Sequence, residues 1–123
     1  MTSGRTLAIA GLLLALATAC GAFGAHALKG QLAPERLQLW DMAVRYQFFQ
    51  ALGLIGVGLV LRSLDVGTLR AAAALIVAGV VLFCGSLYAL SLGAPRAVGV
   101  LTPVGGLAWI GGWLLFAYAT WHR

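Results

Sequence analysis

Charged residues divide the chain into four long uncharged segments. The segments cover residues 6–28, 46–61, 71–95 and 97–122, and they are 23, 16, 25 and 26 residues long. A fixed charge at the centre of a bilayer costs about 2.5–3.5 kcal/mol, and a helix needs about 20 residues to cross the hydrocarbon. The pattern therefore predicts four membrane-spanning helices, of which the second has a short uncharged part.

The second segment is the end of a longer predicted helix. Pro34 suits the first turn of a helix, Glu35 complements the helix dipole, and no Gly or Pro interrupts residues 35–52. Sixteen uncharged residues cover only about 24 Å of a hydrocarbon core of about 30 Å. Arg45 must therefore extend towards the membrane surface or lie inside the bundle, where Asp41, one turn earlier, can pair with it.

The helix ends carry local signals. Gly30 suits a C-terminal cap, Asp65 or Thr68 can cap the third span, and Thr102 followed by a proline can begin the fourth. We expect an all-α polytopic membrane protein, with four transmembrane helices in one antiparallel bundle. It forms a single membrane domain over residues 1–123, with a helix over 34–42 leading into span two. The expected spans are about 6–28, 43–62, 69–92 and 102–121.

Small residues recur every four positions in spans one and three, a pattern that lets membrane helices approach closely. The expected packing residues are Ala17, Gly21, Ala25, Gly85, Ala89 and Gly93. We expect these two faces to contact each other. Among the tryptophans, Trp40 is expected at the membrane interface, and Trp109 and Trp113 are expected to face protein.

The composition also indicates a membrane protein, and it limits the classes of molecule that the protein can bind. The chain is 62% hydrophobic and 9% charged, and its formal charge of +5 comes from single, scattered basic residues. This distribution favours contact with membrane lipids and disfavours nucleic acid. Cys20 and Cys84 lie in apolar runs without metal-ligand spacing, so we expect small packing residues.

An alternative interpretation of the N-terminal segment is a lipoprotein signal that is cleaved before Cys20. Arg5 and the apolar run that follows it resemble such a signal. We favour a retained helix, because Ala17 is a weak match to the leucine typical of these signals and because the apolar helical pattern continues beyond Cys20.

Polar residues gather towards one side of the predicted membrane domain. With an even number of antiparallel spans, the end of span one, the start of span two, the end of span three and the start of span four meet on that side. The candidate polar cluster comprises His26, Asp41, Arg45, Gln47, Gln50, Tyr88 and Thr102. Such a cluster forms a pocket or a partner surface, or it only joins helices through hydrogen bonds.

Several chemistries find no support in the sequence. His26 and His122 fall on opposite sides of the membrane, about 30 Å apart, so they do not suggest a shared metal or haem site. The sequence lacks the serine-hydrolase, phosphate-loop and zinc-protease motifs. The three acidic residues lie near or beyond the predicted span ends. We therefore expect no catalytic residue, no cofactor and no metal.

Four motifs in order resemble the DUF423 family of small membrane proteins. They are GAFGAHALKG at 21–30, WDMAVRYQ at 40–47, FCGSLY at 83–88 and TPVGG at 102–106. The resemblance covers essentially the whole chain and implies four spanning helices in a bacterial plasma membrane. It implies no activity, because the family is defined as uncharacterised. Gln50 stands where the family often carries histidine.

The leading hypothesis is a non-enzymatic accessory or binding protein. Its polar half would recognise a partner membrane protein or a lipid-like molecule, with Arg45 as its charged group and Asp41 as the partner of Arg45. The alternative is a small carrier or channel that needs a homo-oligomer to form a pore. A membrane enzyme is a third, weaker option. Basic residues weakly favour cytoplasmic N- and C-termini.

Overall fold

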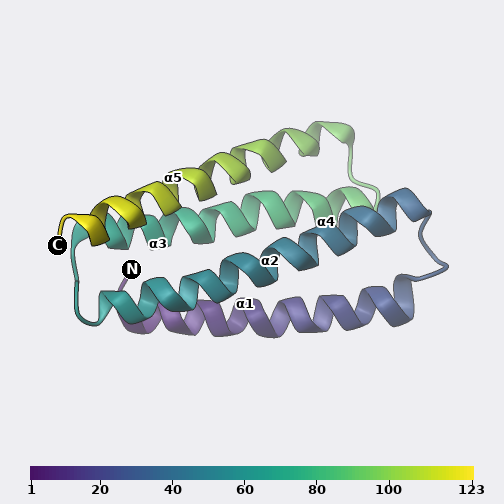
Figure 1. The fold of residues 1–123 in the computed structure, drawn as a ribbon. Helices are drawn as coiled ribbons and strands as arrows, with labels where there is room; N and C mark the ends of the chain where they lie inside the picture. Colours follow the sequence, from purple (N-terminus) through teal and green to yellow (C-terminus); the bar gives the residue numbers. More distant parts are fainter.

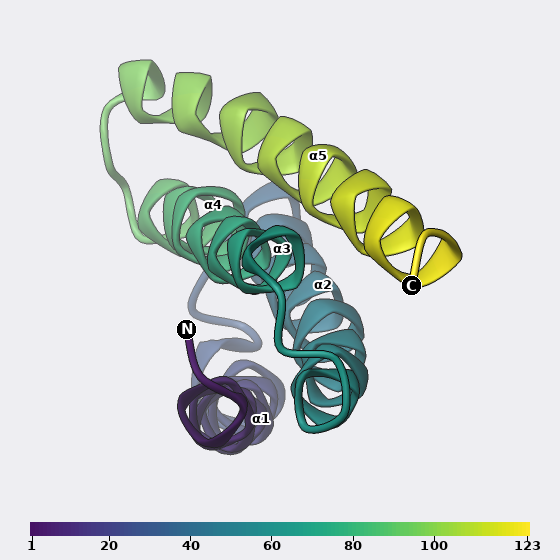
Figure 2. The same ribbon diagram turned by 90° about the vertical axis from the view of Figure 1, so that its left-hand side faces the viewer.

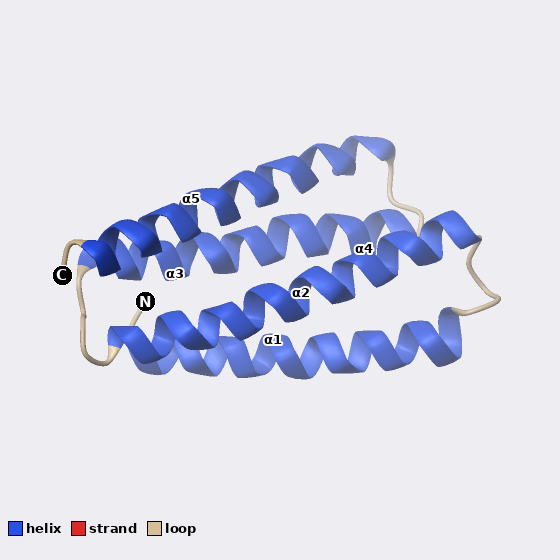
Figure 3. Cartoon of the chain, viewed as in Figure 1, coloured by secondary structure: helices blue, strands red, loops and turns tan.

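The computed structural model describes all residues, 1–123, and contains helices and no strand (Figures 1 and 3). Four helical runs, each long and apolar enough to cross a membrane, follow one another in alternating directions. The runs are α1 (Ser3–Phe23) with η1 (Gly24–Leu28); α2 (Pro34–Leu61); α3 (Gly67–Gly79) with η2 (Val80–Cys84) and α4 (Gly85–Ser91); and η3 (Arg96–Val100) with α5 (Leu101–Trp121). The predicted fold class is confirmed.

The connection between η1 and α2 and the connection between α4 and η3 lie at one end of the bundle and have similar backbone conformations. Gly30 and Gly93 adopt φ values of 85° and 103°, which glycine tolerates best, and each connection leads into an Ala-Pro pair where the next helical segment starts. At the opposite end, Asp65 and Arg70 form an ion pair of 2.6 Å across the tight connection.

Two predicted caps are wrong. The N-cap position of α3 is Val66, which has no capping side chain, because Asp65 bonds Arg70 instead. Helix α5 begins at Leu101 after the 3₁₀ turn η3, so Thr102 lies inside the helix and its hydroxyl is free to bond another helix.

Helices α2 and α3–α4 form the inside of the bundle, and α1 and α5 lie outside. Helix α1 packs mainly on α2, α5 packs mainly on α3, and α2 contacts α3, η2 and α4 (Figure 2). In the most apolar part of each span, 33% and 39% of residues are buried in the two inner runs, against 17% in each outer run. Leu54, Leu69 and Ile76 are fully buried at the centre of the core.

The small-residue faces of spans one and three are separated in the structure. Gly21 packs against a Val44 methyl group of α2 at 3.4 Å from its ideal Cβ position, whereas a Cβ at Gly85 would meet no atom within 4 Å. The expected contact between these faces is replaced by the contact between α1 and α2.

Three tryptophans each pack against a glycine that belongs to a different helix. The pairs are Trp40 with Gly24, Trp109 with Gly79, and Trp113 with Gly53. An ideal Cβ at Gly24 would lie 2.7 Å from the Trp40 ring, and one at Gly53 would lie 2.6 Å from the Trp113 ring. Since real Cβ contacts are longer than this, each glycine is needed for the indole to fit.

The close contacts at the glycines predict how much a glycine-to-alanine substitution lowers the stability of the bundle at each position. A Cβ at Gly79 would clash with Trp109 and lie 2.9 Å from the Gly105 carbonyl oxygen, so Gly79→Ala should destabilise the bundle by about 1–3 kcal/mol. Gly11→Ala in α1 is the control, because nothing lies within 4 Å of that Cβ. Unfolding titrations in mixed micelles measure both; equal stability of the two variants would contradict the packing described.

Candidate functional site

A hydrogen-bonded pair, Gln47 and Tyr88, joins three helices at mid-bundle. Gln47 of α2 is 3% exposed; its Nε2 donates to the Leu13 carbonyl of α1 at 2.8 Å, and its Oε1 accepts from the Tyr88 hydroxyl of α4 at 2.7 Å. A buried amide in a membrane bundle is costly unless its atoms find partners. The bonds therefore fix α1, α2 and α4 in one register.

Trp40 extends this arrangement towards the connection between α1 and α2. Its indole Nε1 donates to the Cys20 carbonyl at 2.8 Å, and its ring lies edge-on to Tyr88 at 4.7 Å between centroids. Only 6% of Trp40 is exposed. The ring therefore packs inside the bundle, and the depth of Trp40 at the membrane interface stays a prediction.

Trp109 makes the same kind of bond as Trp40, from its indole N–H to a backbone carbonyl of another helix. Its indole Nε1 donates to the Ile76 carbonyl at 3.1 Å, and Ile76 lies four residues before the π-helical segment η2, as Cys20 lies four residues before η1. In both places an indole N–H therefore bonds a carbonyl one turn before the helix widens. Local π turns are one way in which membrane helices accommodate extra backbone partners. The prediction that Trp109 faces protein is confirmed.

Two further polar pairs link other helices. Ser86 of α4 and Thr102 of α5 share a hydrogen bond of 2.5 Å, and the Trp113 indole donates to Oε1 of Gln50 at 2.8 Å. Every buried side-chain nitrogen and oxygen atom in the structure has a hydrogen-bond partner. These four side chains therefore join helices and leave no buried polar group unpaired.

An apolar groove lies beside the Gln47–Tyr88 pair, between α1 and the run from η2 to α4. Its volume is about 330 Å³ and seven of its nine lining residues are hydrophobic. Both cysteines line it, a role that sequence reasoning missed because a thiol in an apolar run has the signature of a packing residue. The lining residues are Leu13, Leu16, Cys20, Gln47, Val80, Val81, Cys84, Gly85 and Tyr88.

The structure divides the candidate polar cluster into three groups. Gln47 and Tyr88 meet beside the groove, while Gln50 and Thr102 bond residues of α5 and α4 respectively. His26, Asp41 and Arg45 are exposed. One polar pocket lined by all seven residues is therefore not formed.

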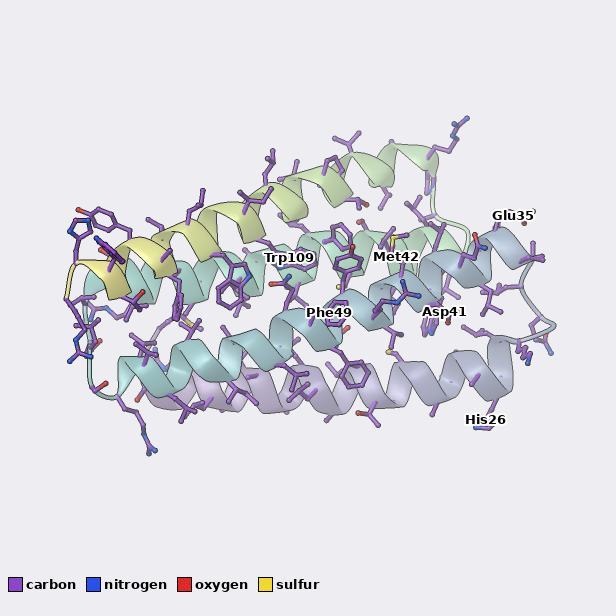
Figure 4. All side chains as sticks on the ribbon, viewed as in Figure 1. His26, Glu35, Asp41, Met42, Phe49 and Trp109 are labelled. Atoms are coloured by element: carbon purple, nitrogen blue, oxygen red, sulfur yellow. The ribbon has the colours of Figure 1, made fainter.

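His26, Asp41 and Arg45 lie on the outer surface of the bundle, and the position of His26 follows from its place in η1. Gly24 and Leu28 are the buried positions of η1, so His26, halfway between them, points away from the bundle (Figure 4). The expected Asp41–Arg45 ion pair is absent; the salt bridge in the structure is between Arg70 and Asp65. No group of three or more His, Cys, Asp or Glu side chains is placed to hold a metal ion.

Four apolar helices with an interior polar pair and an apolar groove define a multi-span membrane protein. Residues 20–106 match the family model described as "Protein of unknown function (DUF423)", and the chain belongs to this family.

The relatives of the chain are bacterial membrane proteins by name. The chain is 43% identical over 100 residues to a UPF0382 membrane protein of Staphylococcus haemolyticus, covering 81% of each chain. It is 42% identical over 105 residues to the UPF0382 membrane protein YwdK of Bacillus subtilis, covering 85% of each. No solved structure matches the chain.

The Gln47–Tyr88 bond predicts non-additive effects of substitution. Tyr88→Phe leaves the buried Gln47 Oε1 without its donor and should cost about 1 kcal/mol of stability. Gln47→Leu should cost more, because it also removes the bond to the Leu13 carbonyl. The double variant should be more stable than the sum of the single effects, with a coupling of about 0.5 kcal/mol or more. Additive losses in unfolding titrations would argue against the bond.

Proposed function

We propose that this protein is a non-enzymatic binding protein of the bacterial plasma membrane whose groove between α1 and η2–α4 holds the apolar chain of a membrane-dissolved molecule. The observation that carries the proposal is the composition of the groove wall. Seven of the nine lining residues, Tyr88 among them, are hydrophobic, and the other two are Gly85 and Gln47. The Gln47 amide already bonds the Tyr88 hydroxyl.

The bond between Gln47 and Tyr88 favours a hydrocarbon occupant. A polar ligand that takes Gln47 Oε1 from the Tyr88 hydroxyl would break a bond of 2.7 Å inside the bundle. An apolar chain needs no such exchange, and it gains the packing contacts that an open groove lacks. The chemistry therefore favours an acyl or isoprenoid chain over a charged solute.

The size of the groove supports partial enclosure. A volume of about 330 Å³ lies at the lower end of ligand pockets, which span roughly 300–1,000 Å³. It suits a segment of one chain rather than a whole lipid. The polar part of the same molecule would then remain at the membrane surface, near the Ala-Pro connections or the opposite end.

The proposed setting is a plasma membrane with both termini in the cytoplasm. Arg5, Arg62, Arg70 and Arg123 lie at the end with the termini, against Lys29, Arg36 and Arg96 at the other end. An excess of basic residues marks the cytoplasmic side. A reporter fused to the C-terminus that is active only outside the cytoplasm should stay inactive; an active reporter would reverse the orientation.

An oligomeric carrier for a small solute is the alternative. Its supporting observation is the pair of exposed charged residues, Asp41 and Arg45, in the membrane-spanning helix α2. Solute flux into liposomes that contain purified protein would favour the carrier, whereas a retained amphipathic molecule without flux favours the binding protein.

Gly85 offers a way to fill the groove without disturbing the bundle. It lines the groove, and nothing lies within 4 Å of its ideal Cβ. Gly85→Phe should therefore insert and fold normally and should lose most of the amphipathic molecule that the native protein retains through purification in mild detergent. Lipid extraction and mass spectrometry of the purified protein measure the loss.

The matched control is Gly11→Phe, which adds the same ring at an exposed glycine of α1 outside the groove, again with no atom within 4 Å of the ideal Cβ. It should retain the molecule at the native level. Equal retention by the native protein and the Gly85 variant, or equal loss from both variants, would contradict the proposed site.

A further inference from the structure

Helix α2 presents an uncovered seam along its outer side. Positions 38, 42, 45, 49, 52, 56 and 59 alternate in steps of four and three residues, and every one of them is exposed. Met42, Phe49, Leu52 and Leu59 have exposed fractions of 38%, 57%, 55% and 52%. In Figure 4, Met42 and Phe49 are labelled along the side of α2 that faces the viewer.

This spacing is that of a helix that packs against another helix. Steps of four and three average 3.5 residues per turn, the period of left-handed helix pairs in coiled coils and in most membrane bundles. The faces that α2 uses inside its own chain include the buried Ala43, Gln47 and Leu54, which lie off the seam. The seam therefore has the spacing of a packing face, and no helix of the chain covers it.

Two charged residues, Arg45 on the seam and Asp41 beside it, lie within hydrocarbon depth. Gln47 bonds Leu13, near the middle of Ser3–Leu28, which places the middle of α2 at the middle of the bundle. At 1.5 Å per residue, the Arg45 backbone is about 4 Å and the Asp41 backbone about 10 Å from that level. The hydrocarbon reaches about 15 Å on each side of the bilayer centre.

Neither charge has an ionic partner within the chain. Gln38, Asp41, Met42 and Arg45 line a shallow hollow of about 260 Å³ on α2, and no salt bridge involves either charged side chain. Ionisable side chains at this depth pair with one another or face a protein interior, because exposure to lipid is costly. The covering surface must therefore be apolar along most of α2 and must offer both charge signs near Asp41 and Arg45.

We infer that a second copy of this chain covers the seam, forming a two-fold dimer in which Arg45 of each copy pairs with Asp41 of the other. The outer side of α2 meets both demands on the covering surface, because the seam is apolar at most positions, Arg45 lies on it and Asp41 borders it. An isologous interface places the same patch on both partners, so two aspartates and two arginines form a neutral group of four.

The charges also select the direction of pairing. Helical side chains lean towards the helix N-terminus, so each Arg45 side chain extends towards the level of Asp41. Parallel α2 helices, related by an axis along the membrane normal, bring all four charged groups to one level. Antiparallel helices that cross at mid-bundle would place them in opposite halves of the membrane, so the geometry favours two copies in the same orientation.

Single cysteines in a Cys20→Ala, Cys84→Ala background test the seam while leaving both charges in place. Met42→Cys, Phe49→Cys and Leu52→Cys should give disulfide-linked dimers in native membranes after mild oxidation. Leu12→Cys of α1 and Leu114→Cys of α5 are controls, since these positions are 66% and 65% exposed and lie off the seam. Cross-linking at the controls equal to that on the seam, or links from the seam to a different protein, would overturn the dimer.

Charge exchange between two differently tagged chains tests the pairing itself. Arg45→Asp gives a chain with two acidic residues at the seam, and Asp41→Arg gives one with two basic residues. Each variant alone should self-associate about fivefold less than the native chain or worse, because like charges face each other. Co-expressed, the two variants should recover association.

Pairing within one chain would not be restored by mixing, so failure of the mixed pair to recover overturns the assignment of Arg45 to Asp41 of the other copy. The groove proposed to hold an apolar chain lies between α1 and η2–α4, and none of its lining residues is on the seam. Loss of ligand on filling the groove and loss of dimer on charge reversal are therefore separate outcomes.

Discussion

Close approach of helices at glycine, with an indole filling each gap, is the constraint on which the rest of this bundle depends. Gly24, Gly53 and Gly79 each accommodate a tryptophan ring from another helix, and each of these rings donates its N–H inside the protein. In a bilayer there is little hydrophobic gain when helices meet, so close packing and satisfied polar groups must hold them together. These contacts supply both.

The packing at the tryptophans also positions the polar pair in the interior, the apolar groove and the exposed seam of α2. Trp40 brings its ring against Tyr88, and Tyr88 bonds Gln47, so the indole sites and the amide–phenol pair form one connected structure. Because Gln47 and Tyr88 bond each other, the adjacent groove offers a mostly apolar wall. On the outer side of α2, the exposed seam with Asp41 and Arg45 is left for another helix. One face suits a hydrocarbon chain and the other suits a second protein surface.

Charge spacing was enough to predict four spanning helices, because a fixed charge in hydrocarbon is costly whatever surrounds it. The same reasoning placed Gln47, Tyr88 and Thr102 in one half of the membrane domain. It could not find the partners of Gln47 and Trp40, since the backbone carbonyls of Leu13 and Cys20 leave no mark in a sequence. His26 and Arg45 were assigned to a shared pocket because depth in the membrane is readable from sequence, whereas the direction around a helix depends on packing and on the π turns.

Three of the four indole N–H groups are bonded inside the bundle, and the packing of the helices depends on these bonds. Trp40, Trp109 and Trp113 each donate at 2.8–3.1 Å, whereas Trp121 is 85% exposed. Nuclear magnetic resonance of protein labelled with ¹⁵N-tryptophan in micelles tests this directly. We expect three indole signals with hydrogen-bonded proton shifts and slow exchange with D₂O, and one fast-exchanging signal from Trp121. A Trp40 or Trp109 signal with the shift and exchange rate of Trp121 would contradict the account.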